Sequence, residues 1–255
     1  MGGAMATRVG SAPKMSDSKD LLVGKTAVIT GAGRGIGKAI ATAFAHAGAC
    51  SVFVVRERAT GEKLAREVKD QGFKADFAVA DVTDSAQISM LVLDITQRYP
   101  VVDVLVNNAG IFLDGDRAMR PSEIDPLVLQ KTLDINLFGP VRVCNAFAPN
   151  IAKGGRIINV SSTMGQFAGA ADGRGPAYSI SKAALNMYTQ LLAADLRERS
   201  IMVDSFHPGW VKTDMGGPQA RVEPQDAART ALFLASRPLS DKTGLFWRDC
   251  EVIDW

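Results

Sequence analysis

The stretch TGAGRGIG, residues 30–37, decides the fold. It joins a short apolar run, KTAVIT (25–30), to GIGKAIATAFAHAG (35–48), in which apolar residues recur at helical spacing before a closing glycine. The run predicts a buried strand, and the second segment predicts a helix with a glycine C-cap. A glycine cluster at such a junction lets the backbone turn tightly and approach a phosphate, which the first N–H groups of the helix can bind.

The glycine spacing of this junction is G-x-x-x-G-x-G, not the G-x-G-x-x-G of the common dinucleotide fingerprint. The alternative interpretation is a glycine-rich turn that only packs a helix on a strand. The position directly after the first strand of an alternating chain favours a dinucleotide-phosphate site. The candidate binding residues of this loop are Gly31, Gly33, Arg34, Gly35, Ile36 and Gly37.

Outward from this junction, strand-like and helix-like segments alternate along the chain. Further strands are predicted over 51–55, 74–82, 102–110, 155–162 and 201–209, with a terminal strand or hairpin over 245–255. Helices are predicted over 60–72, 84–99, 123–150 (kinked at Gly139-Pro140), 177–199 and 223–236. Such alternation indicates an α/β fold: one doubly wound (Rossmann) domain over residues 21–255, with a mostly parallel sheet of about seven strands and helices on both faces.

Composition excludes several classes of protein. Residues 1–20 lack an apolar core and are interpreted as a disordered leader, or in part a cloning remnant. A net charge of +2 argues against nucleic acid or an anionic membrane as partner, and no apolar run reaches the roughly 18–20 residues that span a bilayer. Cys50, Cys144 and Cys250 lie far apart without a CxxC pair, so we expect no metal and a reducing, cytoplasmic location.

The end of the second predicted strand, VFVVRER (52–58), bears on the choice of nicotinamide cofactor. An NAD site usually has an acidic residue here for the ribose 2′-hydroxyl, whereas an NADP site has an arginine for the 2′-phosphate. Arg56 lies at or next to this position, and Arg34 supplies a second cation. NADP(H) is therefore predicted, although Glu57 could serve the ribose if the strand ends one residue later.

Several motifs, taken in chain order, resemble those of the short-chain dehydrogenase/reductase family. They are TGAGRGIG (30–37), NNAG (107–110), Asn136, NVSS (159–162), YSISK (178–182) and PGWVKTDM (208–215), and they span nearly the whole chain from residue 24. PGWVKTDMGGPQA and the ending VIDW are similar to the carbonyl reductase branch.

The resemblance implies a catalytic set of four residues. Tyr178 would be the acid/base, Lys182 its partner, Ser162 the ligand of the carbonyl oxygen, and Asn136 the holder of a proton-relay water. Ser162 is preferred to Ser161 because the family places its serine second in this pair. The resemblance also implies cofactor contacts from Asp81, Val82, Asn107, Asn108, Ala109, Gly110, Tyr178, Lys182, Pro208, Gly209, Val211 and Thr213.

The chemistry of carbonyl reduction explains the spacing of YSISK. A free tyrosine has a pKa of about 10, and a nearby cation favours the phenolate and lowers that value. Residues i and i+4 share one helix face, so Lys182 can stand beside Tyr178. We therefore expect Lys182 to lower the pKa of Tyr178, and Ser162 to add a donor aimed at the carbonyl oxygen.

Two features depart from the family pattern. Ser162 and Tyr178 are 16 positions apart, a few more than usual, and the extra residues lie in GQFAGAADGRG (165–175), a predicted pocket rim. A longer insertion found in some carbonyl reductases is absent, which favours a homodimer or homotetramer over a monomer. His207 stands before the Pro-Gly pair, where its role stays open.

The predicted substrate pocket is apolar. Its candidate walls are Phe112, Met164, Phe167, Trp210 and Met215, and no Arg or Lys is placed among them. The sequence therefore predicts an NADPH-dependent reductase of a small, largely apolar aldehyde, ketone or quinone. The alternatives are an NAD(P)-dependent alcohol, steroid or sugar dehydrogenase on the same fold, and a regulator that binds NADP without turnover.

Overall fold

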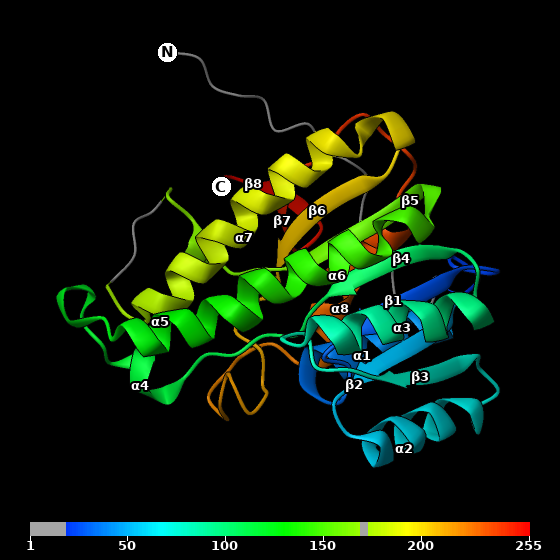
Figure 1. The fold of residues 1–255 in the computed structure, drawn as a ribbon, viewed down its shortest axis with the longest axis horizontal. Helices are drawn as coiled ribbons and strands as arrows, with labels where there is room; N and C mark the ends of the chain where they lie inside the picture. Colours follow the sequence, from blue (N-terminus) through cyan, green and yellow to red (C-terminus); the bar gives the residue numbers. More distant parts are fainter. Residues whose placement is uncertain (1–18, 169–172) are drawn as a thin grey trace.

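The computed structural model describes residues 19–168 and 173–255, so most of the segment interpreted as a leader lies outside it. Within these residues eight strands form one sheet in the order β3-β2-β1-β4-β5-β6-β7-β8, with helices on both faces (Figure 1). The strands from β3 to β7 pair in parallel, and β8 is antiparallel to β7. The doubly wound fold is confirmed, and the terminal segment adds an eighth strand because it forms a hairpin.

The strands are short and regular except for the longer β5. Their bounds are β1 (Thr26–Thr30), β2 (Cys50–Val55), β3 (Ala75–Val79), β4 (Val102–Asn107), β5 (Ile151–Val160), β6 (Met202–His207), β7 (Phe246–Arg248) and β8 (Glu251–Ile253).

The main helices follow the predicted ranges closely, apart from the segment between β4 and β5. They are α1 (Gly35–His46), α2 (Arg58–Lys69), α3 (Ser85–Arg98), α4 (Asp114–Arg117), α5 (Pro126–Leu133), α6 (Gly139–Phe147), α7 (Pro176–Asp195) and α8 (Pro224–Ser236). Shorter turns are η2 (Pro121–Glu123), η3 (Asp134–Phe138), η4 (Ala148–Asn150), η5 (Thr163–Gly165) and η6 (Arg197–Arg199). None of the helices in the described ranges is long and apolar enough to cross a membrane.

Two apolar layers hold the sheet between its helices. Successive side chains of a strand point to opposite faces. Accordingly, Ala27 and Ile29 of β1 join the core under α1 and α8, while Val28 joins the core under α3, α6 and α7. Both faces of the central strands are therefore buried, which explains why these strands read as continuous apolar runs.

The predicted helix over 123–150 is interrupted. It consists of α5, the π-helical turn η3 and α6, so the interruption lies just before the expected kink at Gly139-Pro140. Pro140 has no N–H to donate to the carbonyl of Asn136, four residues earlier, and the N–H of Gly139 bonds to Asp134 O instead. The interruption places Asn136 inside η3.

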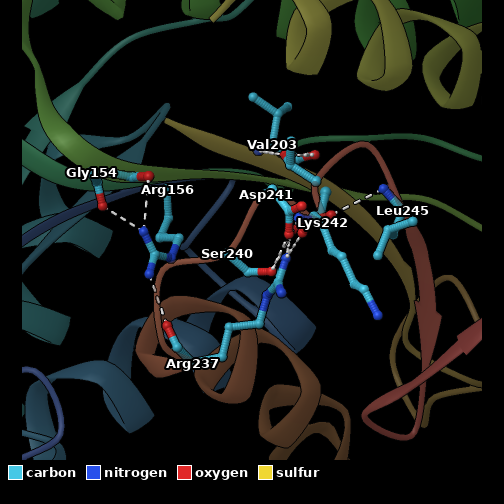
Figure 2. Close-up of polar contacts among 11 residues, drawn as sticks. Gly154, Arg156, Val203, Arg237, Ser240, Asp241, Lys242 and Leu245 are labelled. Atoms are coloured by element: carbon cyan, nitrogen blue, oxygen red, sulfur yellow. Dashed lines mark hydrogen bonds and ion pairs between the residues drawn. The ribbon is translucent and has the colours of Figure 1, made fainter. Parts of the chain in front are cut away.

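A buried charged cluster ties β5 and β6 to the loops beneath them (Figure 2). Arg156 donates to the carbonyls of Gly154 and Arg237, and Arg237 pairs with Asp204 at 2.7 Å. The side chains of Arg237 and Asp204 are each 3% exposed. This ion pair is therefore part of the core, unlike the many ion pairs on the surface.

The sheet reverses its winding between β1 and β4. β1 pairs with β2 on one side and β4 on the other, so the chain crosses over after β3 to return beside β1. In open α/β sheets ligands bind at the carboxyl ends of the strands where this reversal occurs. TGAGRGIG follows β1 and NNAG follows β4, so both motifs meet at this edge.

Candidate active site

A cavity of about 1170 Å³ opens at the carboxyl edge of the sheet, large enough for a dinucleotide. Of the predicted cofactor-binding residues, it is lined by Gly31, Gly33, Arg34, Gly35, Ile36, Gly37, Arg56, Asp81, Val82, Asn108, Ala109, Gly110, Tyr178, Lys182, Pro208 and Thr213. Asn107, Gly209 and Val211 do not belong to this lining, and Asn107 and Val211 are buried.

The glycine loop is held against the NNAG segment. A Cβ on Gly31, whose φ is +63°, would lie 2.8 Å from Ala109 Cα, and one on Gly37 would lie 2.4 Å from Gly31 O. The Thr30 hydroxyl accepts from the backbone N–H groups of Asn108 (3.1 Å) and Ala109 (3.2 Å). Larger residues would break this close approach, so the glycines form a cradle that suits a pyrophosphate.

Arg34, Arg56 and Glu57 bear on the choice of nicotinamide cofactor, and all three line the cavity. Arg56 and Glu57 both line it, so the residues of the NADP and NAD interpretations lie side by side. Arg34 reaches across to Asp214 at 2.5 Å, and both side chains are highly exposed. An exposed ion pair is weak, so Arg34 remains free to exchange Asp214 for an anionic ligand.

Tyr178 and Lys182 occupy one buried face of α7 and both line the cavity. The Lys182 ammonium lies 5.6 Å from the centre of the Tyr178 ring and donates to Val160 O at 2.8 Å. The predicted i, i+4 arrangement is thus present. The side chains point toward the glycine-lined cavity rather than away from it.

The pKa of Tyr178 differs from the expectation. Burial raises it to about 12, and the opposing influences are a hydrogen bond with Ser162 and the positive charge of Arg117. Burial also lowers the pKa of Lys182 to about 8. The predicted lowering of the tyrosine pKa by Lys182 is therefore wrong for this structure, because removal of the phenol from water outweighs the nearby charges.

Ser162 and Ser161 point to different partners. Ser162 Oγ accepts from Met164 N at 3.1 Å, and its side chain lies close enough to the Tyr178 phenol to lower the pKa of that phenol. Ser161 Oγ donates to Asn186 Oδ1 at 2.6 Å. Ser161 lines the cavity and Ser162 does not, whereas Ser162 is the hydroxyl that acts on the pKa of Tyr178.

Asn136 links η3 to the segment after β4. Its Oδ1 accepts from Ile111 N at 2.8 Å, and its Nδ2 donates to Ile111 O and Ser181 Oγ. A Cβ on Gly110 would lie 3.2 Å from Asn136 Oδ1 and 3.8 Å from Lys182 Nζ, so both groups border the same glycine. An amide oxygen accepts two hydrogen bonds, so Oδ1 can also hold a water.

The predicted pocket walls are only partly assembled. Phe112 stacks on Tyr178 with ring centres 4.5 Å apart, and Met215 lines the cavity. A Cβ on Gly175 would approach Phe112 and, at 3.0 Å, Met164. Trp210 is 50% exposed and Phe167 is 81% exposed, and neither of them lines the cavity.

The sequence reasoning missed two neighbours of the tyrosine, Asp116 and Arg117. Asp116 is fully buried and accepts from the backbone N–H groups of Ala177 and Tyr178. The Arg117 guanidinium lies 4.3 Å from the centre of the Phe112 ring and donates to Met215 O at 2.7 Å. The only local signal was the charged run DGDR (114–117) directly after an apolar segment.

His207, whose role the sequence left open, supports the serine loop. It is partly buried, and its Nδ1 lies 3.3 Å from Thr163 N, which donates to it. Burial, together with the charge of Arg248, lowers the pKa of His207 to about 4. The imidazole is therefore neutral near pH 7 and serves as a hydrogen-bond acceptor next to Ser162.

Known proteins are similar to this chain over most of their length. Residues 25–223 match the family model described as short chain dehydrogenase. A 3-oxoacyl-acyl-carrier-protein reductase, FabG, of Chlamydia muridarum is 35% identical over 243 residues, which cover 88% of this chain and 95% of that protein. A galactitol 2-dehydrogenase of Rhizobium johnstonii is 32% identical over 242 residues, covering 88% and 92%.

Solved structures show the same fold. The crystal structure of a blue fluorescent protein from a metagenomic library, in complex with NADPH, has a TM-score of 0.78 and 33% sequence identity. The match covers 88% of this chain and 96% of that one.

Proposed function

This chain belongs to the short-chain dehydrogenase family, and we propose that it is an NADPH-dependent reductase of small, largely apolar aldehydes, ketones or quinones. The observation that carries the proposal is the meeting of Tyr178 and Lys182 at the glycine-lined cavity, with the Ser162 hydroxyl close enough to the phenol to lower its pKa. A phenol, an ammonium group and a hydroxyl gathered in one buried place are the groups that protonation of a carbonyl oxygen requires.

The cofactor proposed is NADP(H). The tight glycine cradle suits its pyrophosphate, and Arg34 and Arg56 suit its 2′-phosphate because a guanidinium can bind phosphate through two parallel hydrogen bonds. The similar structure with bound NADPH supports this choice. When bound, NADPH supplies the hydride.

The proposed roles of the chain's own residues follow from their contacts. Tyr178 donates its proton to the substrate oxygen, because an alkoxide is a stronger base than a phenolate even when the phenol has a raised pKa. Ser162 donates a second hydrogen bond to that oxygen. Lys182, held by Val160 O, supplies the positive charge that compensates the phenolate left behind, and Asn136 Oδ1 holds a water that returns the proton.

The proposed substrate is neutral over most of its surface. Phe112 stacks on the Tyr178 ring, Met164 lies beside Gly175 near Phe112, and Met215 lines the cavity, so the side chains on this side of the phenol are apolar. Arg117 brings one cation to this end of the cavity, but it is already bonded to Met215 O and Asp114.

A second candidate is an NAD(P)-dependent alcohol or sugar dehydrogenase, since a galactitol 2-dehydrogenase is a relative and Glu57 lines the cavity. Loss of NADPH absorbance with aryl ketones, quinones and aldehydes, compared with NAD⁺ or NADP⁺ reduction by alcohols and polyols, separates the two. Consumption of NADPH by the apolar carbonyls supports the proposal. Turnover of polyols alone would replace it, and cofactor binding without any turnover would favour a regulator.

We also propose a homodimer or homotetramer located in the cytoplasm. Large apolar side chains are exposed along α5, η3 and α7, namely Leu127, Phe138, Ile180, Met187 and Leu191. Association through these helices would bury them. Light scattering tests the oligomeric state, and the three free cysteines are consistent with a reducing compartment.

A further inference from the structure

Helix α7, which carries the proposed proton donor, begins without a cap of its own. Its N-cap residue is Gly175, which has no side chain and adopts a φ of +59°. The next residue is Pro176, which has no N–H. The first N–H groups in need of a partner are therefore those of Ala177 and Tyr178, because Ser179 N already bonds to Gly175 O.

Asp116 supplies both partners from a distant part of the chain. Its Oδ1 accepts from Ala177 N at 3.0 Å and its Oδ2 from Tyr178 N at 2.8 Å. The residue is 0% exposed and lies 61 positions before Ala177. One carboxylate thus satisfies the whole first turn of α7 and places a negative charge where the helix dipole favours it.

The placement of this carboxylate restricts where Tyr178 can lie. A buried carboxylate is costly unless hydrogen-bonded, so Asp116 and the two N–H groups stay together. Phe112, four residues before Asp116, stacks on the Tyr178 ring at 4.5 Å. A Cβ on Gly175 would lie 2.7 Å from the Phe112 ring, so the fit at the helix start depends on a glycine there.

The segment from Phe112 to Asp116 therefore contacts Tyr178 twice. Asp116 accepts a hydrogen bond from its backbone N–H, and Phe112 stacks on its ring. The same segment directly follows residues 108–111, which line the cavity. This short segment thus links the proposed cofactor site to the proposed proton donor along the chain.

We propose that Asp116 is a positioning residue for Tyr178: its buried carboxylate fixes the first turn of α7 so that the phenol faces the substrate. The proposal rests on the proposed reductase function. Asp116 itself touches neither substrate nor cofactor in this role. It acts through the backbone of the tyrosine.

The test compares Asp116→Ala and Asp116→Asn with the wild type in NADPH-dependent carbonyl reduction. A displacement of the donor by about 1 Å can cost about 100-fold in rate, so Asp116→Ala is expected to lower kcat by about 10- to 100-fold. The KM for NADPH is expected to change less than about twofold, since the cofactor cradle is untouched. The solvent deuterium isotope effect on kcat is expected to rise, because proton transfer becomes slower than hydride transfer.

Asp116→Asn is isosteric and keeps one acceptor oxygen, so it should restore part of kcat. If Asp116→Ala does not fold, the kcat and the isotope effect of Asp116→Asn test the proposal instead. Two variants serve as controls. Asp114→Asn makes the same charge change on an exposed residue of the same short helix. Asp84→Ala removes a carboxylate that caps α3 through Ala86 N and Gln87 N.

Both controls should keep kcat at saturating NADPH within about twofold of wild type, although Asp84→Ala should lower stability as loss of a helix cap does. Asp116 variants that lose stability like Asp84→Ala but keep kcat and the isotope effect unchanged would overturn the proposal.

Hydrogen exchange separates this proposal from the proposed function. Loss of Asp116 should speed exchange of the Ala177 and Tyr178 amides whether or not a substrate is known. If the wild type reduces none of the carbonyls, the proposed function fails, while faster exchange at these two amides still supports the positioning contact. Unchanged exchange in Asp116→Ala would refute that contact independently of any activity.

Discussion

The Lys182 ammonium lies 5.6 Å from the centre of the Tyr178 ring and bonds to the carbonyl of Val160. The two groups share a buried helix face, where burial raises the pKa of the phenol and lowers that of the amine. In the absence of bound ligands, therefore, each group is shifted toward its neutral form. The proposed chemistry restores charge to this pair as the substrate oxygen takes the proton.

The first prediction concerns the stability cost of Lys182. Its pKa of about 8 lies below the value of 10.5 for an exposed lysine, so the unfolded chain binds the proton more tightly. Burial of the charged amine therefore lowers the free energy of unfolding by about 3 kcal/mol below about pH 8, and this loss decreases to zero as the pH rises from 8 to 10.5. The free energies of unfolding of wild type and Lys182→Met, measured with denaturant, should therefore approach each other between pH 8 and pH 10.5. A difference between them that is independent of pH would contradict the burial of a charged amine.

The second prediction concerns cofactor choice. Arg34→Gln and Arg56→Gln should each raise the KM for NADPH by about 10-fold or more while leaving that for NADH within about twofold, because a charged hydrogen bond contributes about 1.5–3 kcal/mol. Asp214→Asn frees Arg34 and should lower the KM for NADPH. Arg58→Gln, an exposed change on α2, is the control. Equal effects on the two cofactors would refute the assignment of NADP.

The third prediction concerns acid stability. The pKa of His207, about 4, lies below its ordinary 6.5, so its contribution to stability is complete above pH 6.5. That contribution is lost as the pH falls from 6.5 to 4, by up to about 3 kcal/mol. His207→Asn keeps an acceptor for Thr163 N and should flatten this part of the pH–stability curve. Parallel curves for the two proteins would show that the imidazole is not the group responsible.

The fourth prediction concerns the buried ion pair between Arg237 and Asp204. Arg237→Met leaves Asp204 as an unpaired charge in the core and should lower the free energy of unfolding by about 3–5 kcal/mol. Lys63→Met breaks an exposed i, i+4 pair with Glu67 and should cost less than about 1 kcal/mol. Similar losses in the two variants, measured by urea denaturation, would mean that the buried pair contributes no more than a surface one.

Local sequence patterns predicted much of the fold and of the cofactor edge. The glycine spacing of residues 31–37 and the i, i+4 spacing of Tyr178 and Lys182 depend on short-range geometry, and both lie at the cavity as expected. The alternation of strand-like and helix-like segments likewise predicted the parallel sheet from local patterns. For the π-helical turn at Asn136, the sequence predicted only a kink in the helix. The position of the turn depends on which backbone carbonyl lacks a donor because of Pro140, and this is seen only in the folded helix.

What the sequence could not predict depends on contacts between distant residues. Asp116 accepts a hydrogen bond from Tyr178 N although the two residues are 62 positions apart. No local sequence pattern predicts that a helix without a capping side chain of its own is capped by so distant a residue. The pKa of Tyr178 was misjudged because the extent of burial is a property of the folded core, not of the residues beside it in the sequence. Arg117, which lowers that pKa, was absent from the expected pocket for the same reason.

The most direct test of the central claim is the rate of NADPH oxidation with an aryl ketone or quinone by wild type and by Tyr178→Phe. Removing a proton donor commonly costs about 100- to 10,000-fold in rate. The phenol-to-phenyl change leaves the ring stacked on Phe112, so NADPH binding measured by fluorescence should be retained. We expect kcat to fall by at least about 100-fold with cofactor affinity unchanged. Turnover by Tyr178→Phe at the wild-type rate would contradict the account.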